Sequence, residues 1–400
     1  MLKWVVFFFG MELSPSQQEF IDAHAHEDVR ALALRYHRED MPFLLAQIAG
    51  RQTAKQKIPS FYRTRGIVYP PHLSLEQASS EITARYKASL VPPGKARLVD
   101  LTGGMGVDFS LMAPSFLHAC YLEQEEELCR IAAHNFALLG LKQVTVTMAK
   151  GDDALAKMEK ADLIFLDPSR RDEGGRKVFR MEECSPDLTQ LKELLLEKAE
   201  RVMIKYSPML DISLALRTLG EVSEVHIVSV ENECKELLFI LSKDAGECRY
   251  HAVELHLSGE RQVFSFTREE ERQEAVVTSH PGRYLYEPNA AVMKAGAFNA
   301  VGNSYKVMKL HKHSHLYTSD RLLPDFPGRI FTIDEVMVAN RVNIRRYVSQ
   351  TEKVNIAVRN YPISVAEIRR KTGLKDGGED YLFATTLADG QKVWIITRKV

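Results

Sequence analysis

Between Arg97 and Leu241, short apolar segments alternate with stretches in which apolar residues recur every three or four positions. This alternation predicts a mostly parallel sheet with helices on both faces. The predicted strands are Arg97–Leu101, Ala119–Glu123, Val144–Met148, Leu163–Asp167, Val202–Tyr206, Glu224–Val230 and Glu236–Leu241. Only a few residues separate the last two strands, so they must form an antiparallel hairpin. The sequence therefore predicts an α/β domain built on a seven-stranded sheet.

The regions on either side of this domain have different patterns. Before it, Ser14-Pro15-Ser16-Gln17 begins a helical region with a capping box and an early proline. After it we expect a hairpin over Tyr250–Leu257 and Gln262–Phe266, a charged surface connection over Arg268–Glu274, a helix over Asn289–Asn299, a long strand over Tyr305–Tyr317, and a strand-helix-strand-helix-strand-strand order from Ile330. At 400 residues the chain is too long for one ordinary domain. We divide it into an N-terminal helical region (1–70), the α/β domain (71–245), a hairpin with a further small region (246–328) and a small α+β domain (329–400).

Composition excludes several classes of protein. Lys plus Arg equals Asp plus Glu, 53 against 53, which rules out a histone-like polycation but leaves room for a local basic face. The five cysteines are scattered, with no pair at CxxC spacing, so neither a disulfide framework nor a zinc ribbon is indicated. The apolar start MLKWVVFFFG is too short to span a bilayer and lacks a signal-peptide cleavage site. We therefore expect a cytoplasmic protein with no membrane partner.

The strongest chemical signal is the segment LVDLTGGMGVD, residues 98–108. An apolar strand ends at Asp100, a glycine-bearing turn follows, and a helix begins. Gly104 and Gly106 allow the backbone to approach a ligand, and the amides of the helix N-terminus face the same place. A carboxylate at the end of the first strand would repel a pyrophosphate but suits a ligand with a cationic amino-acid end, such as S-adenosylmethionine.

Three further strands also end in acidic residues. Glu123 lies 23 residues after Asp100, close to the usual offset of a ribose-binding acid, and Asp152 and Asp153 follow the third strand, where a carboxylate can accept from the adenine amine. The fourth strand delivers Asp167-Pro168-Ser169-Arg170. Any one of these acids could be an ordinary helix cap, but four at successive strand ends form one constellation at the edge where open α/β sheets bind ligands.

On these residues the chain resembles the class I S-adenosylmethionine-dependent methyltransferases. The D-x-x-x-G-x-G loop, Glu123, the Asp152/Asp153 pair and the DPSR segment are similar to their motif series. More narrowly, the chain resembles a bacterial group in which a seven-stranded Rossmann-like methyltransferase sheet, preceded by an N-terminal helical region, is followed by a ferredoxin-like part and a small α+β THUMP-like domain. Thr102 and Gly103 depart from the usual loop, which looks closer to that of a ribosomal guanine-N2 methyltransferase.

The resemblance implies a cofactor site. S-adenosylmethionine would be held by Asp100, Thr102, Gly104, Gly106, Asp108, Glu123 and Asp152 or Asp153. A predicted helix over Leu73–Ala88 would close over it, with Gln77, Ser80 and Thr83 as candidate contacts. An ordinary amphipathic helix with exposed polar residues explains that pattern equally well.

The DPSR segment gives the catalytic candidates Asp167 and Arg170. It keeps the acid and the stiff turn of the D/N-P-P-Y motif of amine-directed enzymes, but it lacks the aromatic ring that stacks on the base. The missing ring argues against methylation of adenine N6, and methylation of a guanine amine stays possible. Ser169, Arg171, Lys205 and Tyr206 are candidate substrate contacts, since all belong to the same edge of the sheet and a tyrosine can stack on a base. DPSR is also similar to the DPPR of uracil-C5 enzymes, which need a nucleophilic cysteine; Cys234 is the one candidate.

The resemblance to THUMP domains, which are RNA-binding modules, implies RNA as the partner, and the charge of the C-terminal part is compatible with it. Residues 331–400 hold 12 Lys/Arg and 8 Asp/Glu, with basic groups around Arg341, Arg345 and Arg346 and at Arg369-Arg370-Lys371. A phosphate-binding face or a plain solvated surface would both fit this surplus. The alternating His311, His313 and His315 would share one face of a strand. We expect no metal site there, because no acidic partner lies nearby in the sequence, and we interpret the segment as a surface or RNA-facing strand.

Together these features predict an S-adenosylmethionine-dependent methyltransferase that modifies a base in structured RNA, either tRNA or rRNA, with a guanine amine weakly favoured. Two alternatives remain open. One is a small-molecule methyltransferase whose C-terminal domain serves dimerisation. The other is a non-catalytic RNA-binding protein with a decayed methyltransferase fold.

Overall fold

The computed structural model describes residues 5–6, 13–70, 72–169 and 181–400. The chain forms two compact units. The first comprises residues 1–225 and 236–246, and the second comprises residues 226–235 and 247–400. No helix among the described residues is both long enough and apolar enough to cross a membrane.

The first unit begins with a helical region. Its helices are α1 (Pro15–Ala23), α2 (Val29–Arg35), α3 (Met41–Lys57) and α4 (Pro59–Arg63). The predicted capping box is confirmed, because the side chains of Ser14 and Gln17 each accept a hydrogen bond from the other's backbone N–H. Ile21, Leu32, Leu44 and Ile48 form the small apolar core of this region.

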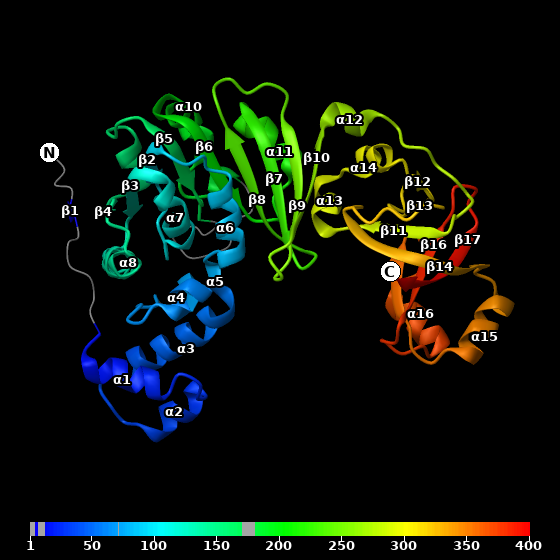
Figure 1. Cartoon of the computed structure of the whole chain (residues 1–400), viewed down its shortest axis with the longest axis horizontal. Helices are drawn as coiled ribbons and strands as arrows, with labels where there is room; N and C mark the ends of the chain where they lie inside the picture. The colour runs from blue at the N-terminus through cyan, green and yellow to red at the C-terminus, as the bar shows by residue number, and fades with distance from the viewer. Residues whose placement is uncertain (1–4, 7–12, 71, 170–180) are drawn as a thin grey trace. The chain divides into compact units, whose positions relative to one another are not determined.

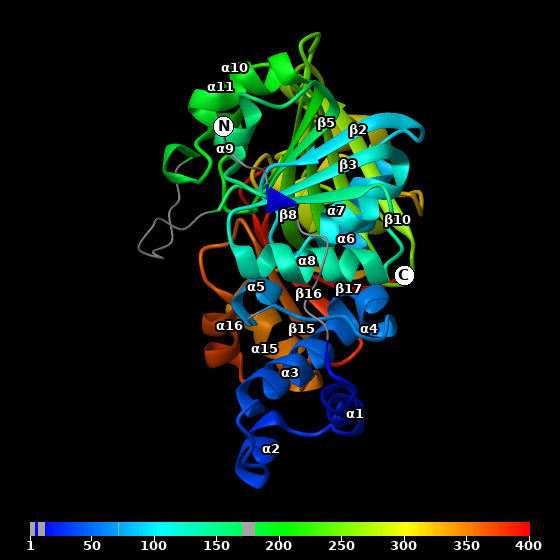
Figure 2. The same ribbon diagram turned by 90° about the vertical axis from the view of Figure 1, so that its left-hand side faces the viewer.

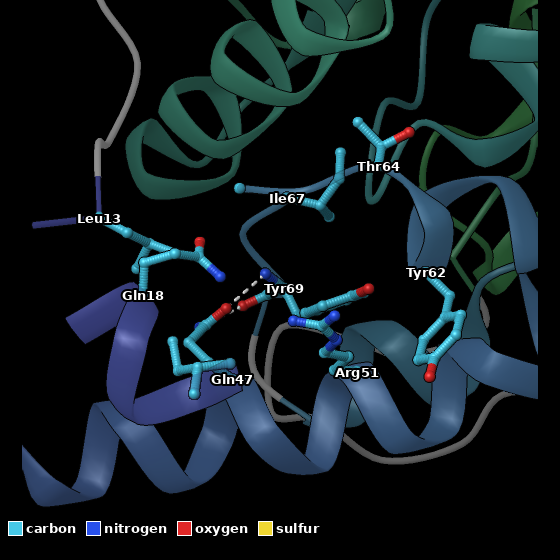
Figure 3. A pocket seen from close by; sticks show the side chains of 10 residues that line it. Leu13, Gln18, Gln47, Arg51, Tyr62, Thr64, Ile67 and Tyr69 are labelled. Carbon is cyan, nitrogen blue, oxygen red and sulfur yellow. Dashed lines mark hydrogen bonds between the residues drawn. The ribbon is translucent and has the colours of Figure 1, made fainter. Parts of the chain in front are cut away.

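A small cavity lies between α1, α3 and the segment that leads to residue 70 (Figure 3). Gln47 lines it and binds the backbone of Tyr69 twice, accepting from the Tyr69 N–H at 2.8 Å and donating to its carbonyl at 3.0 Å. The cavity has a volume of about 10 Å³, which matches a single water molecule rather than a substrate. It is therefore a packing feature of the helical region.

The predicted helix over Leu73–Ala88 is wrong in one respect: it is two helices, α5 (His72–Gln77) and α6 (Glu81–Ser89). The break falls at Ser79-Ser80. Serine side chains offer alternatives to helical backbone bonding, and here the Ser79 hydroxyl donates to the buried carboxylate of Asp108 at 2.7 Å. At the break, the Ser79 side chain therefore contacts Asp108.

All seven predicted strands of the α/β domain are confirmed. They are β2 (Lys95–Asp100), β3 (Phe116–Glu123), β4 (Val144–Met148), β5 (Ala161–Leu166), β6 (Ala199–Tyr206), β7 (Val222–Val230) and β8 (Glu233–Leu241), in the order β4-β3-β2-β5-β6-β8-β7. The pairs among β2 to β6 are parallel, and β8 runs antiparallel to β6. The carboxyl ends of β2 to β6 therefore meet at one edge, together with the beginning of β8.

Helices cover both faces of this sheet (Figure 2). They are α7 (Val107–Met112), α8 (Glu126–Leu138), α9 (Gly151–Leu155), α10 (Leu188–Lys198) and α11 (Ile212–Leu219), with short 3-10 turns at Ala113–Ser115 and Met181–Glu183. Helices α6, α7 and α8 lie on one side, and α9, α10 and α11 lie on the other. Between α7, α8 and the sheet, the rings of Phe109, Tyr121 and Phe136 meet with centroids 5.2 to 5.4 Å apart, which fixes the start of α7 against β3.

The sheet holds more strands than the seven expected, ten among the described residues. Strand β1 (Val5–Val6), inside the apolar N-terminal run, pairs antiparallel with Met148 and Thr147 of β4. In the second unit, the predicted hairpin is confirmed as β9 (Arg249–Leu255) and β10 (Arg261–Thr267), and it follows the His226–Val230 end of β7 in the strand order. Edge strands with unpaired N–H and C=O groups accept further strands readily, which sequence periodicity does not reveal.

The rest of the second unit is a seven-stranded sheet with helices (Figure 1). It contains α12 (Arg268–Arg272), β11 (Tyr284–Pro288), α13 (Ala290–Ala295), α14 (Phe298–Tyr305), β12 (Met308–Lys309), β13 (Tyr317–Ser319), β14 (Gly328–Val338), α15 (Arg341–Gln350), β15 (Asn355–Arg359), α16 (Val365–Thr372), β16 (Asp380–Thr386) and β17 (Lys392–Lys399). Helices α15 and α16 cover one face, where Tyr347 and Ile368 join the cluster around Trp394. The order of elements predicted from Ile330 onward is confirmed.

The charged segment from Arg268 lies at the surface as expected, and it forms the short helix α12, stabilised by a capping box between Thr267 and Glu270. The long strand expected in this unit is wrong. The expected strand over Tyr305–Tyr317 is instead the end of α14, two short strands and a turn, so His311, His313 and His315 share no strand face. His315 has a positive φ of 52°, which a continuous strand could not contain.

Candidate active site

The carboxyl edge of the sheet holds a buried acid, Asp100, at the end of β2. Its carboxylate accepts from the backbone N–H of Thr102 at 2.9 Å and from the Thr102 hydroxyl at 3.3 Å. The same hydroxyl accepts from the backbone N–H of Asp167 at 2.7 Å. Thr102 thus joins the ends of β2 and β5, two strands that lie side by side.

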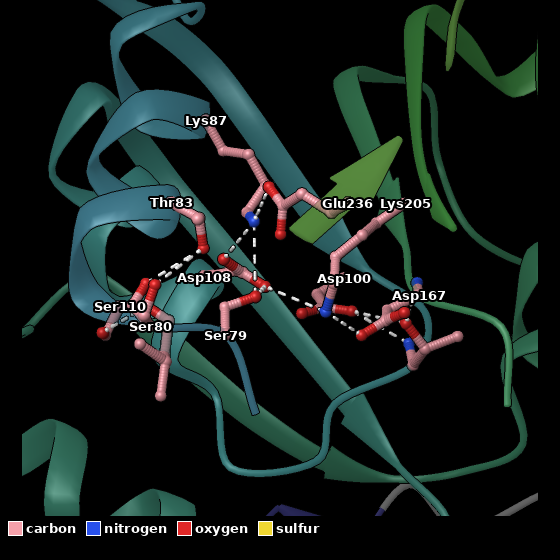
Figure 4. Close-up of polar contacts among 12 residues, drawn as sticks. Ser79, Ser80, Thr83, Lys87, Asp100, Asp108, Ser110, Asp167, Lys205 and Glu236 are labelled. Atoms are coloured by element: carbon pink, nitrogen blue, oxygen red, sulfur yellow. Dashed lines mark hydrogen bonds and ion pairs between the residues drawn. The ribbon is translucent and has the colours of Figure 1, made fainter. Parts of the chain in front are cut away.

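Asp167 meets a lysine at this edge (Figure 4). The Lys205 ammonium, near the end of β6, donates to the Asp167 carboxylate and lies 3.8 Å from Oδ2 of Asp108, at the start of α7. The side chain of Lys205 is 11% exposed and that of Asp167 is 39% exposed. Asp167 is therefore the member of this group that solvent or a substrate can reach.

A second lysine, Lys87, also contacts Asp108. Lys87 of α6 is fully buried, and its ammonium lies 3.1 Å from Oδ1 of Asp108 and 2.5 Å from the carboxylate of Glu236. It also donates to the Ser79 hydroxyl at 3.3 Å. Lys87 therefore ties α6 to α7 and to the beginning of β8, the two elements that carry Asp108 and Glu236.

Within the part of the chain that the structure describes, four acids (Asp100, Asp108, Asp167 and Glu236) gather here with two lysines, Lys87 and Lys205. Burial raises the pKa of Asp100 well above its usual range, and the charges of Asp108 and Asp167 raise it further. Burial opposes ionisation of Asp108 as well, but the ammonium groups of Lys87 and Lys205 outweigh it and lower the pKa of Asp108. Burial likewise opposes the charged form of Lys205, yet Asp167 and Asp108 raise its pKa. The cluster therefore suits a cationic ligand.

The glycine loop is held in place by Glu123 at the end of β3. One oxygen of its carboxylate accepts from the Gly104 N–H at 2.8 Å, and the other accepts from the N–H groups of Gln124 and Glu125 at 2.7 and 2.8 Å. The Tyr121 hydroxyl donates to the Gly104 carbonyl. A carboxylate has about four acceptor positions, so Glu123 retains capacity for a ribose hydroxyl while it supports the loop.

The two glycines of the loop serve different purposes. A Cβ on Gly106 would lie 2.5 Å from the Phe136 ring, whereas a Cβ on Gly104 would meet nothing closer than 3.9 Å. Both have positive φ, 71° and 75°. Gly106 thus allows α7 to pack closely against α8, while the surface beside Gly104 is open to a ligand.

The remaining predicted residues are placed as follows. Asp152 and Asp153 are exposed in the first turn of α9, and Gln77 is exposed at the end of α5. Ser80 precedes α6, where its hydroxyl lies 3.3 Å from that of Thr83. Ser169 is exposed and exchanges two backbone hydrogen bonds with Ser185. Tyr206 is only 3% exposed, and its ring packs against Phe239, so its ring does not face solvent. Arg170 and Arg171 lie outside the described residues.

Sequence reasoning missed Lys87 and Glu236. Lys87 lies seven residues after Ser80 and four after Thr83, so it falls on the helix face that was already considered for cofactor contacts. Glu236 is the first residue of the final predicted strand. Because that strand is antiparallel, its beginning lies at the carboxyl edge of the others. The helical spacing of Lys87 and the antiparallel direction of the strand that contains Glu236 could both have been taken from the sequence.

A parallel sheet of this order, with carboxylates gathered at its carboxyl edge, defines a class I methyltransferase domain. Over 98% of its length the chain is similar to a solved structure from Porphyromonas gingivalis W83, a protein with a provisional methyltransferase assignment, at 32% identity, 100% coverage of that chain and a TM-score of 0.87. In the second unit, a ferredoxin-like domain matches residues 284–327 and a THUMP-like domain matches residues 328–399. The chain belongs to the family of class I S-adenosylmethionine-dependent methyltransferases with C-terminal ferredoxin-like and THUMP-like domains.

Two further solved structures are similar to the chain at a much lower level. An rRNA methylase from Streptococcus thermophilus is 15% identical, with 40% of this chain and 94% of that chain covered and a TM-score of 0.31. A SAM-dependent methyltransferase from Agrobacterium tumefaciens is also 15% identical, with 50% and 64% covered and a TM-score of 0.33. Values this low carry no argument about substrate. No curated protein matches the chain.

Proposed function

We propose that this protein uses S-adenosylmethionine to methylate a base in structured RNA, tRNA or rRNA. The observation that carries the proposal is the group of carboxyl groups at one sheet edge: among the described residues, Asp100, Asp108, Asp167 and Glu236 lie there with two lysines, and Asp167 is the exposed member. The cofactor is cationic overall, with a sulfonium and an ammonium against one carboxylate, so its charge complements this edge.

The residues present fit such a cofactor. The open surface beside Gly104 leaves room for its amino-acid end next to Asp100. Glu123 would accept from the ribose, and Asp152 or Asp153 would accept from the adenine amine, as expected for acids at successive strand ends. When bound, the cofactor supplies an electrophilic methyl group on its sulfonium.

Asp167 is the catalytic candidate in this proposal. Lys205 binds its Oδ2, so Oδ1 is the oxygen that an acceptor amine of a guanine base would meet. Asp167 would accept a hydrogen bond from that amine and orient its lone pair toward the methyl group. Positioning of this kind contributes most of the rate enhancement in a simple displacement. The base must leave its helix or lie in a single strand to reach the site.

Titration calorimetry with S-adenosylhomocysteine tests the cofactor part. Asp100→Asn keeps the shape of the side chain but removes its charge, and we expect at least a tenfold loss of affinity, about 1.4 kcal/mol. Asp244→Asn is the matched control, since Asp244 is exposed beyond the end of β8, at the opposite edge. Absence of binding by the unaltered protein, even at millimolar ligand, would favour a decayed fold.

Nucleoside mass spectrometry tests the RNA part. RNA from a strain that lacks this protein should have lost one methylated nucleoside, and the wild-type gene should restore it. Asp167→Ala should fail to restore it, whereas Asp244→Asn should succeed. An unchanged set of nucleosides in both tRNA and rRNA, with cofactor binding intact, would favour the small-molecule alternative.

A further inference from the structure

The second unit contains a linked set of basic and polar side chains that the proposed cofactor site does not use. Glu287, at the end of β11, is 4% exposed and accepts from two arginines. Arg329, at the start of β14, donates to its Oε2 through Nε at 2.9 Å and through Nη2. Arg359, at the end of β15, donates to its Oε1 at 2.8 Å. One buried carboxylate therefore orients two guanidinium groups, each 37% exposed.

Glu287 balances the charge of only one of the two arginines, and several of their N–H groups make no hydrogen bond to it. An arginine has five N–H groups, and these contacts use two from Arg329 and one from Arg359. The Nε of Arg359 is buried without a hydrogen-bond partner among the described residues. A ligand from solvent would therefore meet the exposed part of the guanidinium group rather than this atom.

The turn after β12 continues the same surface. Asn360, next to Arg359, donates from Nδ2 to Nδ1 of His311 at 3.0 Å, and the backbone N–H of His313 donates to the same nitrogen at 3.0 Å. Since Nδ1 accepts twice, His311 is the neutral tautomer with its hydrogen on Nε2. His311 is thus a further fixed donor, and the exposed Lys312 adds a second positive charge.

Two of these histidines have a lowered pKa, and the side chains that contribute to the shifts include Lys309, Lys312 and Arg359. Burial lowers the pKa of His311, and His313, Lys312 and Lys309 lower it further. Burial also lowers the pKa of His315, to about 4, with Lys309, Arg359 and His313 acting in the same direction. The local potential is therefore positive even where the histidines are neutral.

We propose that Arg329, Arg359, His311 and Lys312 form a phosphate-binding site for the RNA backbone, built jointly by the ferredoxin-like and THUMP-like parts. The inference rests on the proposed RNA substrate and narrows where that RNA is held. It differs from the sequence expectation, which placed the basic face on α15 and α16. On those helices, Arg346 is paired with Glu335 and Arg369 with Asp376, so part of their charge is already neutralised.

A salt titration of RNA binding compares the two surfaces. The probe is fluorescently labelled bulk tRNA with the full-length protein, between about 50 and 200 mM salt. Lys312→Glu reverses a charge at the exposed turn, and Arg345→Glu makes the same change at an exposed position on α15. We expect Lys312→Glu to weaken binding roughly tenfold and to reduce the slope of log K against log salt by about one. Arg345→Glu should change affinity by less than about twofold.

A second variant tests the arginine geometry without leaving Glu287 unpaired. Arg359→Lys keeps a positive charge beside Glu287 but removes the planar fork, and we expect it to weaken tRNA binding roughly fivefold at unchanged secondary structure. The inference would be overturned if Arg345→Glu weakened tRNA binding as much as Lys312→Glu or more. It would also be overturned if neither Lys312→Glu nor Arg359→Lys weakened tRNA binding. The proposed RNA substrate would stand in both cases. Failure of the unaltered protein to bind RNA would overturn both. Binding to anionic lipid vesicles, lost in the same variants and stronger than RNA binding, would identify a membrane partner instead.

Discussion

The hydroxyl of Thr102 accepts a 2.7 Å hydrogen bond from the backbone N–H of Asp167 while it donates to the carboxylate of Asp100. One small side chain thus connects the acid proposed to face the cofactor with the acid proposed to face the methyl acceptor. In the general class I methyltransferase loop that the sequence resembles, the place of Thr102 is usually glycine, which has no hydroxyl to form these two bonds. The departure noted in the sequence therefore has a structural role in this protein.

Thr102→Val should weaken cofactor binding without unfolding the first unit. Valine has nearly the same shape, but it leaves the Asp167 N–H without its acceptor and Asp100 without one donor. Each lost hydrogen bond costs about 1 kcal/mol, so we expect affinity for S-adenosylhomocysteine in calorimetry to fall roughly tenfold. Thr102→Ser keeps the hydroxyl and should bind like the unaltered protein. Equal affinities for valine and threonine would show that the connection has no part in binding.

Cofactor binding should release a proton from Asp100. Burial, with Asp108 and Asp167, raises the pKa of Asp100, so the ligand-free carboxyl holds its proton at pH values where an exposed aspartate has lost it. A cationic amino group favours the carboxylate, so the proton leaves on binding and affinity increases with pH until the pH exceeds that raised pKa. Calorimetry in buffers of different ionisation enthalpy measures the release. Asp100→Asn should show none, and identical heats for the unaltered protein in all buffers would contradict the prediction.

Lys87→Met should strongly destabilise the first unit. The substitution leaves Asp108 and Glu236 buried without their shared ammonium, and removal of one partner from a buried ion pair costs about 3–5 kcal/mol. Denaturant unfolding measures this loss. Adding Glu236→Gln should recover part of it, because one unpaired charge is then removed. Lys95→Met is the control: Lys95 pairs with Glu200 at the surface, and such pairs contribute within about 1 kcal/mol. A loss no larger than that of the control would mean that Lys87 is dispensable.

His315 should make the second unit less stable in mild acid. Burial and neighbouring cations lower its pKa from 6.5 to about 4, so between those values the unfolded chain binds a proton that the folded chain does not. Stability therefore falls as pH decreases through this window. Because the ring is only half-buried, we expect about 1–2 kcal/mol after solvent screening. Thermal unfolding at pH 7.5 and 5 checks it. His315→Asn tolerates the positive φ and should reduce the difference; an unchanged difference would assign it to other groups.

Much of the α/β domain follows from local sequence alone. A parallel strand such as β5 is buried on both faces along most of its length, so it stands out as a short apolar run between helical patterns. The positions of Asp100, Glu123 and Asp167 follow in turn, since the carboxyl ends of parallel strands must share one edge. What periodicity could not give is the partner of each acid, because contacts such as that of Lys87 with Glu236 join residues 149 positions apart.

The second unit was harder to predict for a different reason. Strand β12 has two residues and β13 has three, so neither shows a period, and the apolar residues between Tyr305 and Tyr317 imitate one long strand. The turn between them depends on the left-handed backbone of His315 and on hydrogen bonds to the distant Asn360. Tertiary contacts of this kind override local preference.

Because Lys87 is completely buried, its chemical labelling can report the opening of helix α6. Amine-reactive reagents modify only unprotonated amines that they can reach, so Lys87 can be acylated only when α6 separates from α7 and β8. Its rate of labelling, relative to that of exposed lysines, would therefore measure how often this helix opens. If S-adenosylhomocysteine slows the labelling of Lys87, the opening of α6 is coupled to cofactor binding.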